Sequence, residues 1–153
     1  MKMEFDLEER IRRASDNFMN GYNCSQAVFM AYYDLVKMDK TIAEKVVLGL
    51  GGGVGGSGEI CGTLSSMSLF GGFAVNSTEP DYKSLVYAKV KHHVDEFGET
   101  FGGVQCRYLK SASETRMENT PAAEREKKYY NNRVCIEYVV EAARRVGKML
   151  LGE

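Results

Sequence analysis

Apolar residues recur at helical spacing in several separate stretches of the chain. In the first, the apolar side chains of residues 7–18 share one helical face, behind a capping pair formed by Asp6 and Glu9. Gly21 is expected to end this helix. A second helix is predicted to begin after Asn23, with Gln26 as capping partner, and to keep one apolar face as far as Leu35.

The middle of the chain predicts three more helices. One opens at Thr41 with Glu44 as capping partner, and its expected core face carries Ile42, Val46, Val47 and Leu50. Another covers residues 59–70 and packs closely through small side chains, because serine and threonine separate its apolar positions. A long helix then starts near Asp81, and Gly98 is a candidate break in it.

The C-terminal third predicts a short helix over residues 104–109, a polar loop over residues 111–120 and a charged turn after Pro121. Asn131 and Asn132 are expected to cap the last helix, in which Cys135 shares the core face. No stretch reads as a convincing strand. The whole pattern, residues 1–153, predicts a single all-α domain, a bundle of six or seven helices with a glycine-rich loop.

Composition narrows the class of partner. The 153 residues include 20 Lys and Arg against 21 Asp and Glu, so a nucleic acid or anionic membrane bound mainly by charge is not expected. The charged N-terminus lacks a secretory apolar run, which predicts a cytoplasmic protein. A small molecule, an inorganic cofactor or another protein remains as partner, and the methionines and aromatic residues leave a homodimer interface open.

Four cysteines are the main chemical candidates, because each is predicted to lie where a helix begins: Cys24, Cys61, Cys106 and Cys135. Backbone N–H groups at a helix start lower the pKa of a thiol, and the thiolate is the form that attacks and binds metals. The spacing contains no Cys-x-x-Cys and no ferredoxin pattern, so any metal site must be assembled by the tertiary fold. The alternative is that all four are small buried packing residues.

A glycine run precedes Cys61, with seven glycines among residues 49–58. It matches Gly-x-Gly-x-x-Gly, but a dinucleotide site requires a preceding strand and a phosphate loop requires a lysine, and neither is present. We therefore interpret the run as a loop that allows close backbone approach and brings Cys61 to a helix start. Glu59 is interpreted as a cap or a cation ligand, and His92 and His93 as solvated side chains.

These residues resemble the C_GCAxxG_C_C family, bacterial and archaeal redox-active proteins with four cysteines and a Cys-Gly-Ala-x-x-Gly segment. Residues 23–28 resemble its first cysteine element, residues 51–62 its glycine-rich second, and Cys106 and Cys135 its third and fourth cysteines, over residues 7–146. Thr63 replaces the family's alanine and Ser66 its second glycine. The chain is also similar to the helical part of split-Soret cytochromes, although Cys-x-x-Cys-His is absent.

The resemblance implies an iron–sulfur cluster, [2Fe–2S] in the leading hypothesis, that serves electron transfer or redox sensing with an unidentified redox partner protein and is open to loss in air. The expected metal ligands are Cys24, Cys61, Cys106 and Cys135, and the expected cofactor-binding residues are Gly52, Gly53, Gly58, Glu59 and Gly62. Two alternatives stay open, a thiol–disulfide oxidoreductase with a cycling cysteine pair and a non-catalytic helical interaction module. Whether the protein is an enzyme is not decided by the sequence.

Overall fold

The computed structural model describes residues 3–119 and 134–153. Within these ranges the chain forms seven α-helices besides the short turn α4, and the bridge between Ile60 and Gln105 is isolated, with no strand around it. The predicted all-α bundle is confirmed. The elements are α1 (Leu7–Met19), α2 (Cys24–Phe29), η1 (Tyr33–Val36), α3 (Lys40–Leu48), α4 (Gly51–Val54), α5 (Gly62–Ser68), η2 (Gly71–Phe73), α6 (Tyr82–Phe101), α7 (Cys106–Glu118) and α9 (Ile136–Leu150).

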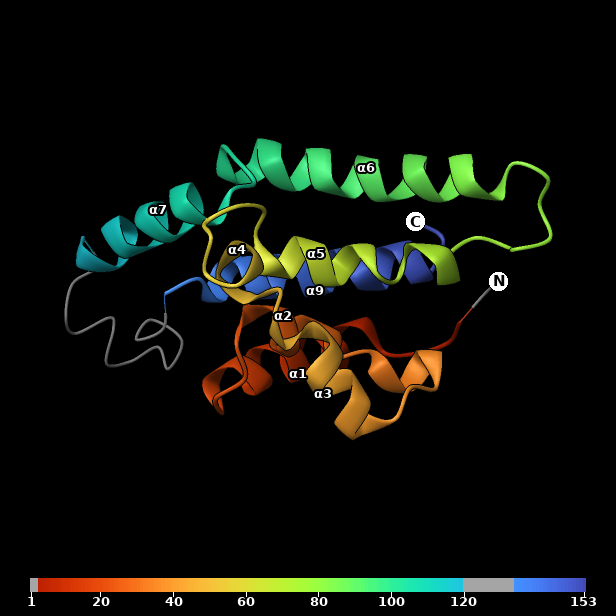
Figure 1. Ribbon diagram of the computed structural model, residues 1–153, viewed down its shortest axis with the longest axis horizontal. Helices are drawn as coiled ribbons and strands as arrows, with labels where there is room; N and C mark the ends of the chain where they lie inside the picture. Colours follow the sequence, from red (N-terminus) through yellow and green to blue (C-terminus); the bar gives the residue numbers. More distant parts are fainter. Residues whose placement is uncertain (1–2, 120–133) are drawn as a thin grey trace.

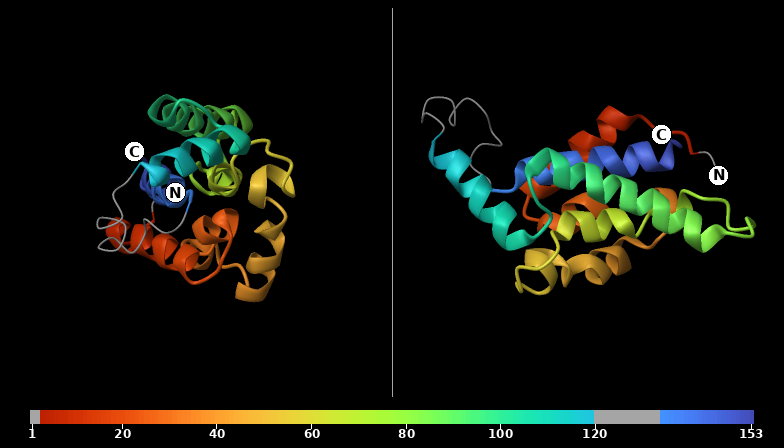
Figure 2. Two further views of the ribbon diagram at one scale, coloured as in Figure 1. Left: turned by 90° about the vertical axis from the view of Figure 1, so that its left-hand side faces the viewer. Right: turned by 90° about the horizontal axis from the view of Figure 1, so that it is seen from above.

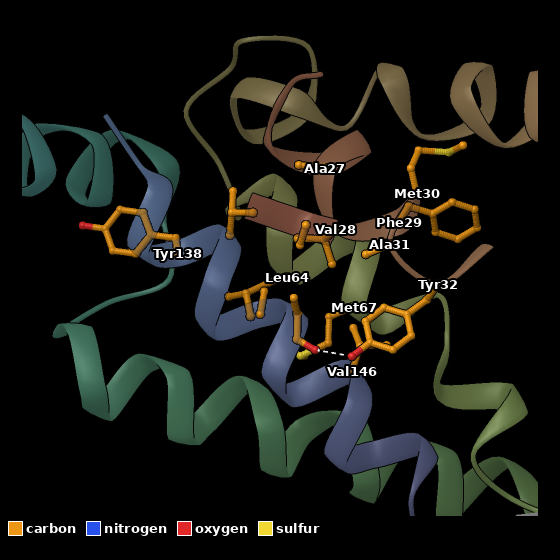
Figure 3. Packing of buried hydrophobic residues seen from close by; sticks show 14 of the residues in the cluster. Ala27, Val28, Phe29, Met30, Ala31, Tyr32, Leu64, Met67, Tyr138 and Val146 are labelled. Atoms are coloured by element: carbon orange, nitrogen blue, oxygen red, sulfur yellow. Dashed lines mark hydrogen bonds between the residues drawn. The ribbon is translucent and has the colours of Figure 1, made fainter. Parts of the chain in front are cut away.

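Helix α9 lies at the centre of the bundle. It contacts α1, α2, α5 and α6, and the views place α6 on one side of it and α1 and α2 on the other (Figures 1 and 2). Figure 3 shows Val28 of α2 and Leu64 and Met67 of α5 packed toward Val146 of α9. The hydroxyl of Tyr32 donates a hydrogen bond of 2.8 Å to the carbonyl of Ala143. These contacts fix the helices α2, α5 and α9 against one another.

The helix starts follow the sequence signals in two cases and depart in a third. Asp6 caps α1, and Asn23 with Gln26 forms the predicted capping box of α2. The predicted cap of α3 is wrong: its N-cap is Asp39, whose carboxylate accepts from the backbone of Ile42. The carboxylate of Glu44 accepts a hydrogen bond from the hydroxyl of Tyr22 instead, at 2.6 Å.

The predicted core face of α3 is correct only in part, because Val47 is buried and Leu50 is half-buried as expected, but Ile42 and Val46 are not. Ile42 and Val46 are 55% and 56% exposed, whereas Ala43 and Val47 are buried. The reason is that α2 holds α3 by its backbone: the Gln26 side-chain amide donates to the carbonyl of Glu44, at 2.9 Å. Helix α2 itself is shorter than expected, because it ends at Phe29 and the chain turns before Leu35.

Two further expectations fail in the second half of the chain. Helix α6 runs through Gly98 without a break, and His93, expected to be solvated, is only 2% exposed because it faces Arg145 of α9. Residues 111–118 are helical rather than a loop, since Ser113 continues the buried face of α7. Pro121, Asn131 and Asn132, predicted to form a turn and a cap, lie outside the described residues. Among the helices of the described ranges, none has the length and apolar character needed to cross a membrane.

Candidate functional site

All four cysteines line one cavity of about 270 Å³. Figure 1 shows α4 at the end of the bundle where α7 and α9 begin. Cys24 and Cys106 are the first residues of α2 and α7, and Cys61 and Cys135 are the N-caps of α5 and α9. The prediction that each cysteine lies at a helix start is confirmed. All four thiols are free rather than paired in disulfides. The other lining residues are Phe18, Asn23, Gly52, Gly62, Leu109, Lys110, Val134 and Tyr138.

Cys24 is positioned by hydrogen bonds that join the start of α2 to the end of α3. The side-chain amide of Asn23 donates to the carbonyl of Leu48 at 3.0 Å, and the hydroxyl of Ser25 donates to the carbonyl of Val47 at 2.8 Å. Both acceptors belong to the last turn of α3, whose carbonyls have no acceptor role in a further helical turn; that of Val47 also accepts from the backbone N–H of Leu50 at 3.1 Å. The residues on either side of Cys24 therefore hold it at the cavity.

Cys61 and Cys106 are brought together by the bridge between Ile60 and Gln105. The backbone N–H of Cys61 donates to the carbonyl of Val104 at 2.8 Å, and that of Cys106 donates to the carbonyl of Glu59 at 2.6 Å. The two segments are thus paired backbone to backbone. This pairing places two cysteines that are 45 residues apart in the sequence on the same cavity.

The glycine run forms a left-handed turn. Gly52, Gly53, Val54, Gly55 and Gly56 all have positive φ, between 60° and 77°. Left-handed backbone is strained for residues with a Cβ, which explains why glycine dominates this segment. The turn brings backbone close to backbone: the N–H groups of Gly58 and Glu59 donate to the carbonyls of Gly52 and Gly53.

Two of the glycines are required by close approach. A Cβ on Gly53 would lie 2.5 Å from the backbone nitrogen of Glu59 and 2.7 Å from the Cβ of Cys106. A Cβ on Gly62 would lie 2.9 Å from both the sulfur of Cys24 and the carbonyl oxygen of Leu50. The absence of side chains here allows the turn, α5 and two cysteines to share one small volume.

Of the five residues expected to bind a cofactor, only two line the cavity. Gly52 and Gly62 line the cavity, and Gly53 is buried behind it. Gly58 and Glu59 are held on the outer side by Arg107, whose guanidinium donates to the carbonyl of Gly58 and forms an ion pair of 2.7 Å with the carboxylate of Glu59. This ion pair is exposed, so it adds little to stability.

Cys135 adopts an unusual backbone conformation. Its φ is 77°, in the left-handed region, and its backbone N–H donates to the hydroxyl of the buried Ser113 at 2.8 Å. A residue with a side chain is strained in this region, and such strain concentrates at functional sites. The fold holds Cys135 at the cavity despite the cost.

Cys24, Cys61 and Cys135 do not have the lowered pKa that helix starts were expected to give them. Burial raises the pKa of Cys61 to about 11 and that of Cys135 to about 12, and it raises the pKa of Cys24. Repulsion between neighbouring thiolates adds to burial at all three, while hydrogen bonding with the Gly52 backbone opposes it at Cys24. Desolvation outweighs the helix ends, so the expectation was wrong for these three thiols.

The burial and arrangement of the four thiols test whether they are packing residues or ligands of a single metal ion. Cys61 is buried in the hydrophobic core, and Cys24 and Cys135 are partly buried against that core. Cys106 is also partly buried, and all four thiols line the cavity, so they do more than fill space between helices. Within residues 3–119 and 134–153, no group of three or more His, Cys, Asp or Glu side chains is arranged to hold a metal ion. The four thiols share a cavity but do not close on a single point.

Several lining residues escaped the sequence analysis. Leu109 and Lys110 follow Cys106 by three and four residues and share its helical face, and Ser113 continues it. Helical spacing from Cys106 indicates Leu109 and Lys110, whereas Ser113 was missed because residues 111–120 were expected to be a loop. Tyr138 follows Cys135 by three residues, and its hydroxyl donates to the carbonyl of Leu109 at 2.7 Å.

The fold and cavity define an all-α domain that gathers four cysteines from distant segments into one site. Comparison with family profiles identifies the chain: it belongs to the C_GCAxxG_C_C family, described as "Putative redox-active protein (C_GCAxxG_C_C)", which matches residues 22–149. No curated protein and no solved structure matches the chain. The similarity to split-Soret cytochromes stays a prediction.

Proposed function

We propose that the protein is a redox module that binds an iron–sulfur cluster, [2Fe–2S] in the first instance, through Cys24, Cys61, Cys106 and Cys135. The observation that carries the proposal is the single cavity lined by all four thiols. Membership of a family described as redox-active supports it. Because the net charge of the chain is only -1, the proposed partner is another protein in the cytoplasm rather than a nucleic acid or a membrane.

The donor set fits this cofactor. Four cysteine thiolates are the usual ligands of iron–sulfur clusters, and such clusters supply a one-electron redox couple when bound. The cavity volume of about 270 Å³ is several times the roughly 30 Å³ of a water molecule in the liquid, so it has space for a group of several atoms. A cation among four mutually repelling thiolates would also relieve that repulsion.

The surrounding residues supply the rest of the environment. Phe18, Leu109 and Tyr138 place apolar surface around the thiols and limit the access of water. Gly52 and Gly62 bring backbone close to the sulfurs, since hydrogen bonding with Gly52 already reaches Cys24. Gly53, Gly58 and Glu59 act from outside the cavity by holding the left-handed turn in place.

No observation favours the alternative of a thiol–disulfide oxidoreductase. Its reactive cysteine would need a low pKa, whereas burial raises the pKa of three of these thiols. A helical interaction module whose cysteines only pack is also disfavoured, because all four cysteines line one cavity.

Anaerobic purification tests the proposal. We expect a coloured protein that contains iron and acid-labile sulfide, directly or after reconstitution, and we expect Cys61→Ser to lose the colour and at least half of the iron. His92→Gln is the matched control, because it removes a metal-ligand type of side chain that is exposed and outside the cavity. Wild-type protein that stays colourless and free of iron after reconstitution would contradict the proposal.

A further inference from the structure

The hydroxyl of Thr63 lies 3.0 Å from the sulfur of Cys61, and this is the feature of the site that the family pattern does not account for. Thr63 stands where the family has alanine, which carries no hydroxyl. Its side chain is fully buried, and Cys61 is only 5% exposed. Within the described residues, the Thr63 hydroxyl forms its hydrogen bond with the Cys61 sulfur and not with a backbone group.

We propose that Thr63 is a positioning residue that sets the reduction potential of the cysteine site by donating a hydrogen bond to the sulfur of Cys61. The inference rests on the proposed cluster function. A Cys61 sulfur bound to iron carries no proton, so in that state the hydroxyl must donate and the sulfur must accept.

The direction of the effect follows from charge. Reduction transfers one electron from a one-electron donor to the site, with no covalent bond formed or broken, and makes the sulfur ligands more negative. A hydrogen bond to a more negative acceptor is stronger, and the apolar surroundings of Thr63 increase this difference. The hydroxyl therefore stabilises the reduced form more than the oxidised form and raises the reduction potential.

Local packing supports a specific role for this hydroxyl. Hydrogen bonding with the backbone of Thr63 and Leu64 reaches the same sulfur, so Cys61 faces the N-terminus of α5 as well as the hydroxyl. The second departure from the family pattern, Ser66, behaves differently: its hydroxyl donates to the carbonyl of Ser25 at 2.7 Å. Ser66 links α5 to α2, whereas Thr63 alone of the two contacts a sulfur.

The experiment is a redox titration of the anaerobically reconstituted protein. Thr63→Val removes the hydroxyl at nearly constant volume, and Thr63→Ala, the residue of the family pattern, does so without a β-branched side chain. Thr63→Ser retains a hydroxyl. Ser68→Ala is the matched control, because the hydroxyl of Ser68, on the same helix, donates to the carbonyl of Leu64 and contacts no cysteine.

With iron and sulfide contents equal to wild type, we expect Thr63→Val and Thr63→Ala to shift the equilibrium three- to tenfold toward the oxidised form. For one electron, tenfold corresponds to about 59 mV. Thr63→Ser should shift it less than twofold, and Ser68→Ala should not shift it.

Two results overturn the inference and are distinguishable. Iron-loaded Thr63 variants with the wild-type potential, or an equal shift in Ser68→Ala, would overturn it while leaving the proposed function intact. Wild-type protein that takes up no iron would remove the proposed function, and the inference with it.

Discussion

Val54 occupies the left-handed turn of residues 52–56, where every other residue is glycine. Its φ is 69° and its side chain is 47% exposed, so it is strained and gains little from burial. We expect Val54→Gly to raise the free energy of unfolding by about 0.5 to 1 kcal/mol. Relief of about 1 to 2 kcal/mol of strain exceeds the entropy that glycine adds to the unfolded chain. Urea unfolding of the two proteins measures the difference.

The matched control is Val46→Gly. Val46 is also exposed, at 56%, but it lies within the ordinary helix α3, where glycine is about 0.5 kcal/mol worse than valine. The pair should therefore change stability in opposite directions. Equal destabilisation by both substitutions would show that Val54 is not strained.

His93 gives the protein a pH-dependent stability. Burial, with Arg145 and His92 beside it, lowers the pKa of His93 from 6.5 to about 4, so the folded protein keeps this side chain neutral. The opposing carboxylate of Glu96 is paired with Arg145. Between pH 6.5 and 4 the unfolded chain binds a proton that the folded chain does not, and stability falls as the pH falls through this window.

Unfolding of wild type and His93→Gln at pH 7 and at about pH 4.5 checks this expectation. The loss of stability on acidification should be smaller in His93→Gln by about 1 to 2 kcal/mol, because glutamine does not titrate. His92→Gln is the comparison: it removes an exposed imidazole that contributes less to the pKa shift of His93 than burial does, so it should reduce the acid loss much less than His93→Gln. The same acid loss in His93→Gln as in wild type would contradict the assignment.

At the scale of elements, the contact between α4 and the start of α7 holds the cysteine cavity together. Gly53 and Gly55 both have positive φ, but only at Gly53 would a Cβ meet backbone and Cys106 within 2.7 Å. We expect Gly55→Ala to cost about 1 kcal/mol from backbone strain alone, and Gly53→Ala a further 1 to 3 kcal/mol from the clash. Chemical unfolding measures both costs.

Gly53→Ala and Gly55→Ala also distinguish the effect of backbone strain from the effect of displacing Cys106. Gly53→Ala must displace the segment that carries Cys106, so it should also lose more than half of the iron taken up on reconstitution. Gly55→Ala should retain it, because nothing lies within 4 Å of its added Cβ. Equal iron contents in the two variants would show that the turn does not set the position of Cys106.

Helix starts could be predicted from the sequence because capping is local. Asn23 and Gln26 identify the start of α2 within a few residues, and the glycine run identifies the close approach before α5. The faces of the helices could not be predicted as well. Helix α3 exposes Ile42 and buries Ala43 because α2 holds its carbonyls, and this constraint comes from residues about 20 positions away.

At the scale of the whole molecule, the sequence identified the four cysteines of the site. It did not reveal how deeply the fold buries them or in which direction burial shifts their pKa. Four cysteines at four helix starts suggested convergence, and the cavity brings them together. The sign of the pKa shift was missed because burial depends on the packing of α9 and α7, which local sequence does not show. Ser113, which holds Cys135, was missed because the polar residues 111–120 were expected to be a loop rather than part of α7.

The central claim is that all four cysteines act together on one bound group. Its most direct test is a thiol count on anaerobically reconstituted native protein, before and after removal of iron with a chelator. We expect the four cysteines to resist a thiol reagent while iron is bound, and all four to react once the iron is removed and the chain is unfolded. Iron-loaded protein in which any of the four reacts as fast as in the unfolded chain would contradict it.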